Sequence, residues 1–169
     1  MTAPLAWHFL PVSCALGYGD GRVVAPGSVV SVDPERLDLC HYGLHGSVDV
    51  LDALSYAPGP VLCRVELSGR ILRGDDKLCV ETRRVVWMAD PTRADDTLRA
   101  FARRCALDAI HLWAAPDVVR RYLETGDETL RAAAWDAARA AAWDAAWDAA
   151  RSRQRGRLIA MMSRIAVRP

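Results

Sequence analysis

The spacing of hydrophobic residues changes near residue 90, and this change constrains the fold of the chain more than any other feature. In the stretch 61–67, Arg64 and Glu66 alternate with apolar residues, which is the two-residue period of a β-strand with one buried face. From about residue 93 the apolar residues recur every three or four positions, as in an amphipathic α-helix. Strands followed by helices predict an α+β fold.

Residues 1–90 are expected to form a strand-rich domain, a small and mostly antiparallel sheet with one short helix. The helix is expected over 48–56, because Ser47 can cap it and a Pro-Gly-Pro sequence follows it. The Ser68-Gly69 pair is expected to end the strand that begins at Val61. The other expected strands are 6–10, 29–32, 71–73 and 78–88.

The rest of the chain is expected to be α-helical in two parts. Residues 91–126 should pack on the same core, with one helix that starts at Pro116 and stops at Gly126. Residues 127–169 should form one long helix that is rich in Ala and Trp and ends in an Arg-rich segment. Within it, residues 133–152 repeat with a period of four, so its tryptophan stripe winds slowly around the helix.

This last segment leaves two interpretations open. Its tryptophans either pack on the body of the molecule or bind a partner or a second copy of the chain. The last 21 residues contain six arginines and no acidic residue, so they either stay in water or bind an acidic protein or nucleic acid. Trp and Arg are typical of interface hot spots, which favours a host protein as partner. The candidates are Trp135, Trp143, Trp147, Arg155 and Arg157.

Composition excludes several classes of protein. Hydrophobic residues make up 51% of the 169 residues and charged residues 25%, which is typical of a folded globular protein and excludes overall disorder. No apolar run approaches the roughly 20 residues of a membrane span, so no membrane partner is expected. The five widely spaced cysteines and the lack of basic residues before the first apolar stretch favour a cytoplasmic protein without disulfides.

The densest group of reactive side chains lies between residues 39 and 47. Cys40, His41 and His45 could be metal ligands, but a zinc site needs a further ligand and none is evident, so no metal is expected. Cys40 or Ser47 could instead be a nucleophile with a histidine base. The structural interpretation makes His41 and Tyr42 ordinary strand residues and Ser47 only a helix cap.

A longer pattern resembles a family of phage and bacterial domains of unknown function. It comprises C-x-x-G-L-H-G-S at 40–47, L-D-A-L-x-Y at 51–56, R-V-E-L-S-G at 64–69 and G-D-D-K at 74–77. The resemblance covers about residues 5–90 and implies a phage or prophage setting. We therefore expect an accessory protein that acts on a host macromolecule. The alternative is a non-catalytic inhibitor of host defence that binds a host protein through the C-terminal helix.

More distantly, the same region is similar to the central part of ADP-ribosyltransferases of the poly(ADP-ribose) polymerase type. That resemblance implies NAD as the cofactor and His8 as a contact to its ribose. It places His45 and Tyr56 at the positions of two tyrosines in the family, with Ser47 as a further cofactor contact in the same turn. A catalytic site of this kind would bring these residues into one cleft.

The resemblance also implies a catalytic carboxylate. Glu81, on the strand expected over 78–88, would stabilise the positive charge that develops on the ribose when nicotinamide leaves. Glu66 is the rival candidate of the same residue type. A transferase would need Glu81 in the cleft, whereas a binding protein would need its tryptophan stripe exposed.

Overall fold

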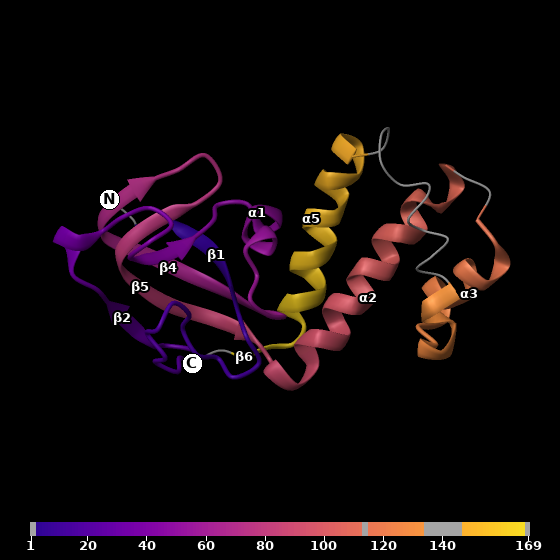
Figure 1. The fold of residues 1–169 in the computed structure, drawn as a ribbon, viewed down its shortest axis with the longest axis horizontal. Helices are drawn as coiled ribbons and strands as arrows, with labels where there is room; N and C mark the ends of the chain where they lie inside the picture. The colour runs from indigo at the N-terminus through magenta and orange to yellow at the C-terminus, as the bar shows by residue number, and fades with distance from the viewer. Residues whose placement is uncertain (1–2, 113–114, 134–146, 168–169) are drawn as a thin grey trace. The chain divides into compact units, whose positions relative to one another are not determined.

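The computed structural model describes residues 3–112, 115–133 and 147–167, with only the backbone of residues 147–150 and 152 (Figure 1). A mostly antiparallel sheet and several helices confirm the α+β fold. The chain forms two compact units. The sheet unit comprises Met1–Asp95 and Ile159–Pro169, and the helical unit comprises Asp96–Leu158. The last 11 residues thus belong to the unit that begins the chain.

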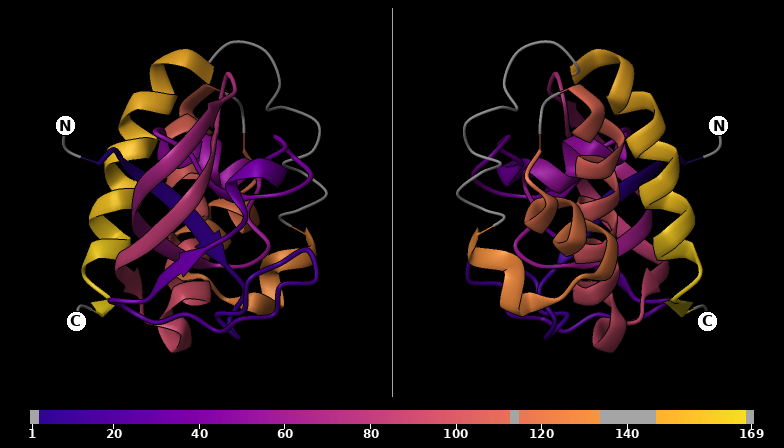
Figure 2. Two further views of the ribbon diagram at one scale, coloured as in Figure 1. Left: turned by 90° about the vertical axis from the view of Figure 1, so that its left-hand side faces the viewer. Right: turned by 90° about the vertical axis from the view of Figure 1, so that its right-hand side faces the viewer.

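Two long antiparallel strands, β4 (Val61–Arg73) and β5 (Leu78–Ala89), form the centre of the sheet unit as a curved hairpin (Figure 2). One face of each strand is apolar, and it buries residues such as Val65 and Val85 in the core. All the other strands pair antiparallel with one of these two. β1 (Leu5–Leu10) pairs with β4. Successive parts of β5 pair with three short strands, β3 (Leu44–Gly46), β2 (Val29–Ser31) and β6 (Ala166–Val167).

The expected end of a strand at Ser68-Gly69 is wrong, because β4 continues to Arg73 through a bulge. The register against β5 shifts between Ser68 and Ile71. Gly69 has a φ of +76°, a conformation that costs little only for glycine. A bulge lets a strand bend without ending, so one strand covers the two segments predicted on either side of the Ser-Gly pair.

The short helix α1 (Val50–Ser55) is present where it was expected, but Ser47 does not cap it. The Asp49 carboxylate accepts the cap hydrogen bond from the Leu51 N–H at 2.8 Å. Ser47 instead exchanges two backbone hydrogen bonds with Trp7, of 2.7 and 2.9 Å. This pairing extends β3 alongside β1 and fixes the position of the loop that precedes α1.

One helical segment ends where the sequence predicts, and another ends earlier. α3 (Asp117–Thr125) stops at Gly126, which has the expected left-handed conformation with a φ of +73°. The helix expected to reach residue 169 ends at Ser163, and β6 follows it.

No helix within the described ranges is both long and apolar enough to cross a membrane. The remaining helices are α2 (Pro91–Ala109), α5 (Trp147–Ser163) and the 3-10 turns Pro34–Arg36, Ile110–Leu112 and Glu128–Leu130.

Candidate functional site

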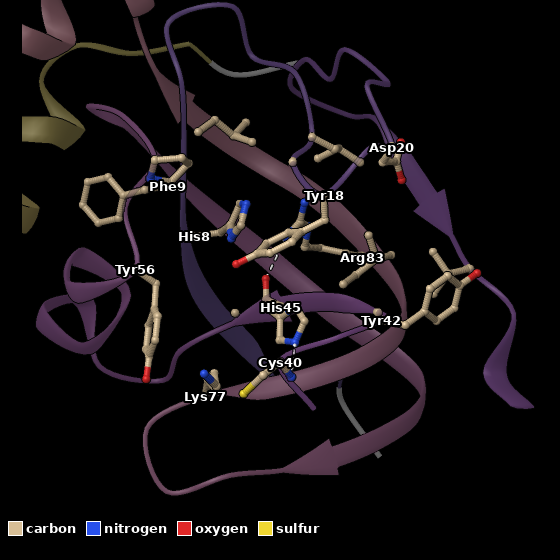
Figure 3. A pocket seen from close by; sticks show the side chains of 18 of the residues that line it. His8, Phe9, Tyr18, Asp20, Cys40, Tyr42, His45, Tyr56, Lys77 and Arg83 are labelled. Atoms are coloured by element: carbon tan, nitrogen blue, oxygen red, sulfur yellow. Dashed lines mark hydrogen bonds between the residues drawn. The ribbon is translucent and has the colours of Figure 1, made fainter. Parts of the chain in front are cut away.

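A cavity of about 1080 Å³ lies within the sheet unit (Figure 3). Its walls come from β1, the end of β2, β3, the end of α1, two loops at residues 15–22 and 40–43, Lys77 just before β5, and Arg83 in the middle of β5. A cavity of this size is at the upper end of the range for small-molecule and cofactor sites. It is therefore large enough for a ligand as big as a dinucleotide.

Four of the five residues predicted to contact a cofactor or the reacting atoms line this cavity. They are His8 on β1, His45 on β3, Ser47 just after β3, and Tyr56 at the end of α1. The backbone pairing between Trp7 and Ser47 explains why, since it brings β1 and the end of β3 side by side.

Glu81 is not among the residues that line the cavity. Its carboxylate accepts a hydrogen bond from the Arg70 N–H at 3.0 Å, and its side chain packs against Gly69 at the bulge in β4. Glu66, the rival carboxylate, lies 3.4 Å from a guanidinium nitrogen of Arg84 and is also absent from the cavity wall. The structure thus separates the predicted carboxylate from the predicted cofactor contacts.

The two cavity histidines lie in an environment that disfavours a positive charge. The pKa of His8 is held well below its ordinary value, mainly by burial and further by the charges of Arg83 and His45. Burial also lowers the pKa of His45, with additional contributions from Lys77 and Arg83. Both imidazoles are therefore neutral at pH 7, and a neutral imidazole has one N–H donor and one acceptor nitrogen. The acceptor nitrogen of His45 is already bonded to the Cys40 N–H.

Backbone geometry explains the glycine in the C-x-x-G-L-H pattern. Gly43 has a φ of +138°, and a Cβ at this position would overlap the Sγ of Cys79 and the side chain of Leu37. Cys40 has a φ of +76°, which is strained for a residue with a side chain. Its N–H donates to Nε2 of His45 at 3.3 Å, so the loop and the imidazole hold each other in place.

A second side of the cavity carries an aromatic ring and an ammonium group. The Nζ of Lys77 lies 4.0 Å from the centroid of the Tyr56 ring. The Tyr56 hydroxyl donates to Asp76 at 2.5 Å, and this bond raises the pKa of Tyr56. The pKa of Lys77 is raised too, first by the Cys40 thiol and then by Tyr56. This group provides an aromatic surface and a positive charge at one end of the cavity.

Sequence reasoning missed Arg83, which the structure places in the cavity wall. Arg83 is only 2% exposed, and its Nη1 donates to the carbonyl oxygen of His45 at 2.7 Å. Its Nε is buried and has no hydrogen-bond partner among the described residues. Burial lowers the pKa of Arg83 to about 10. The run of Glu81, Thr82, Arg83 and Arg84 suggests ion pairs on a surface, so its sequence gave no sign of a buried arginine.

Sequence reasoning also missed Tyr18, which belongs to the glycine-rich loop before β2. Its side chain is 96% exposed although it borders the cavity, and its φ is +57°. Figure 3 shows the ring between His8 and Arg83 at the cavity mouth. An aromatic ring that buries almost none of its surface contributes little to folding, and it offers a face on which a planar ligand can stack.

Of the predicted partner-binding residues, Trp147, Arg155 and Arg157 belong to α5. Trp135 and Trp143 fall outside the described residues, and the structure describes only the backbone of Trp147. Arg155 is half-buried. Within the helical unit, Arg157 forms a two-pronged ion pair with Asp108, with nitrogen–oxygen distances of 2.5 and 3.3 Å. The expected tryptophan surface therefore stays a prediction, and Arg157 has a partner within its own unit.

In the parts of the chain that the structure describes, no group of three or more His, Cys, Asp or Glu side chains is arranged to hold a metal ion. Cys40, His41 and His45, the metal ligands considered from the sequence, are thus not clustered in this way. Comparisons of the chain with models of protein families, with curated proteins and with solved structures give no match.

Proposed function

We propose that the sheet unit binds a dinucleotide of the NAD type in the cavity beside β1 and β3. The observation that carries this proposal is the convergence of His8, His45, Ser47 and Tyr56 on one cavity of about 1080 Å³. Neutral imidazoles and a hydroxyl suit the hydroxyl groups of a ribose, and aromatic rings suit a planar base. The size of the cavity matches a ligand with two such halves.

The geometry supports binding more strongly than turnover. Cleavage of the nicotinamide–ribose bond needs a carboxylate beside the developing positive charge. The acidic residues in the cavity wall are Asp20 and Asp33, and both already accept hydrogen bonds within their own loops, from Arg22 and from the Glu35 N–H. ADP-ribosyl transfer by a phage-type accessory protein is the catalytic form of the proposal, and it requires a carboxylate to reach the bound ribose.

Calorimetric titration of the full chain with NAD tests the proposal. We expect saturable binding to the native protein and affinity at least about tenfold weaker for His45→Gln, the loss of roughly one hydrogen bond to a bound ligand. Glutamine keeps an acceptor for the Cys40 N–H, so the loop should be preserved. His111→Gln is the matched control, because His111 is exposed and lies in the helical unit. No saturation at millimolar NAD would overturn the proposal.

Release of nicotinamide during the same incubation separates binding from transfer. Release of nicotinamide that requires His45 would establish the catalytic form, and the molecule that accepts the ADP-ribose would then have to be identified. Saturable binding without release would leave the protein as a nucleotide-binding module. The two outcomes therefore decide between an enzyme and a binder without any knowledge of the acceptor.

A further inference from the structure

Arg83 is a buried cation that makes no ion pair within the described residues, and the Asp20 carboxylate in the same cavity wall acts on it only through space. Within the described parts of the chain, no carboxylate lies within ion-pair distance of its guanidinium. Its one hydrogen bond goes to the neutral carbonyl oxygen of His45. A guanidinium has five N–H donors, and an uncompensated buried charge is strongly destabilising. A bound anion would compensate such a group.

The surroundings of Arg83 on the strand give no structural compensation. Its neighbours across the sheet are Val30 on β2 and Leu67 on β4, which are both buried and apolar. Arg84, the next residue, has an exposed side chain near Glu66, as is usual for a strand arginine. Arg83 therefore stands on the buried side of the same strand and faces the cavity, where the nearest influence of a carboxylate is that of Asp20, which has its own ion pair with Arg22.

We infer that Arg83 is the receptor for a phosphate group of the ligand that occupies this cavity. The inference rests on the proposed function, because it requires that the cavity binds a ligand. It adds that a phosphate group of this ligand contacts Arg83. A phosphate at the cavity face of the guanidinium compensates the buried charge and accepts charge-assisted hydrogen bonds. The neutral imidazole of His8, which shares the cavity with Arg83, can donate one more.

Two aromatic rings belong to the wall of the same cavity as Arg83. Tyr18 borders the cavity mouth beside Arg83, and Tyr56 lies at the far end next to Lys77 (Figure 3). A phosphate or diphosphate on Arg83 would leave both rings available to planar parts of the same ligand. An anion site with aromatic rings in the same cavity suits a nucleotide, whose planar base and phosphate need both kinds of group.

Inorganic pyrophosphate tests the phosphate site separately from nucleotide recognition. Titration of the full chain at fixed ionic strength should show saturable binding that Arg83→Gln weakens about tenfold or more. Arg84→Gln is the matched control and should bind like the native protein. Equal affinity of Arg83→Gln and the native protein, or no saturable binding by the native protein, overturns the inference. Competition between pyrophosphate and NAD should place both in one cavity.

A measurement on the native protein keeps the test decisive if Arg83→Gln does not fold. In NMR spectra of the imidazole groups, pyrophosphate should shift the resonances of His8 and His45 and leave those of His111 unchanged. Unchanged His8 and His45 resonances at saturation would exclude the site. If the protein binds pyrophosphate but does not bind NAD, the proposed function is refuted and the phosphate site stands. If Arg83→Gln binds NAD as tightly as the native protein, the phosphate site is refuted and the proposed function stands.

Discussion

The side chain of Glu81 occupies the space in which a side chain on Gly69 would lie. The two residues face each other across the bulge in β4, where the Glu81 carboxylate accepts the hydrogen bond of the Arg70 N–H. Gly69 also has a positive φ of 76°. The glycine and the glutamate thus form one structural element, in which the glycine allows the bend and the glutamate satisfies the N–H that the bend exposes.

Gly69→Ala should therefore destabilise the protein by about 2 kcal/mol, the sum of an unfavourable φ and a displaced glutamate. Urea unfolding followed by tryptophan fluorescence would measure the loss. Gly17→Ala is the control, because a Cβ on Gly17 meets nothing within 4 Å and its φ is not positive. It should change the free energy of unfolding by less than about 0.5 kcal/mol. Equal losses in the two variants would contradict the account of the bulge.

Glu81→Gln should leave NAD affinity within about twofold of the native value, because Glu81 does not line the cavity. Glutamine keeps an acceptor for the Arg70 N–H, so the bulge should persist. Calorimetric titration of both proteins would measure the affinity. A large loss of affinity or of nicotinamide release in a folded variant would instead return Glu81 to the site, in line with the family resemblance.

Stability should fall as the pH decreases below about 6.5, the ordinary histidine pKa. The folded-state pKa values of His8 and His45 are lowered, first by burial, so the unfolded chain binds more protons in this range. The loss should continue until the pH reaches the folded-state values. Urea unfolding at about pH 5.5 and 7.5 would reveal it, and His45→Gln should reduce the difference while His111→Gln should not. A native protein equally stable at both pH values would exclude neutral buried imidazoles.

Cys40 should react first among the five thiols. It is exposed at the cavity wall, whereas burial raises the pKa of Cys63 to about 12 and of Cys105 to about 11. Because the thiolate is the reactive form, these two should react only after unfolding. Alkylation followed by peptide mass spectrometry would give the order, and Cys40→Ser should remove the fast phase. Protection of Cys40 by NAD would support a ligand in the cavity, and equal rates with and without NAD would argue against one.

Asp108→Ala should lower the free energy of unfolding by about 1 kcal/mol, because Asp108 and Arg157 form a two-pronged ion pair whose side chains are each 30% exposed. High salt should reduce the difference from the native protein. Glu124→Ala, at an exposed position of α3, is the control. Thermal unfolding at low and high salt would measure both. No difference between the two variants would mean that the pair contributes nothing.

The sequence predicted the regular elements where local patterns decide them. The strands around Val65 and Val85, the helix before Tyr56 and the stop at Gly126 all depend on period, caps and glycine conformation, which neighbouring residues determine. β6 was missed because it has only two residues, and its pairing with Met88 and Ala89 depends on residues far away in the chain. No local pattern signals such a strand.

The site could be predicted only in part for a related reason. His45 and Ser47 lie in a segment rich in reactive side chains, so composition pointed to them. Glu81 and Arg83 are two residues apart on β5, and the strand period assigns both to the same face. The structure separates them because the bulge opposite Glu81 offers it the Arg70 N–H, while Arg83 faces the cavity. Only the pairing of β4 with β5 contains this information.

The return of the chain to the sheet as β6 makes the intervening part an insertion. The chain leaves the sheet after Ala89, and Ala166 pairs with that same residue. The four-residue repeat of residues 133–152 lies wholly within this insertion, so copies of it can be gained or lost without altering any strand or any residue of the cavity wall. A change in copy number should therefore leave the residues of the cavity wall unaltered, and a chimera that exchanges the repeat alone should bind NAD with the same affinity as the native protein.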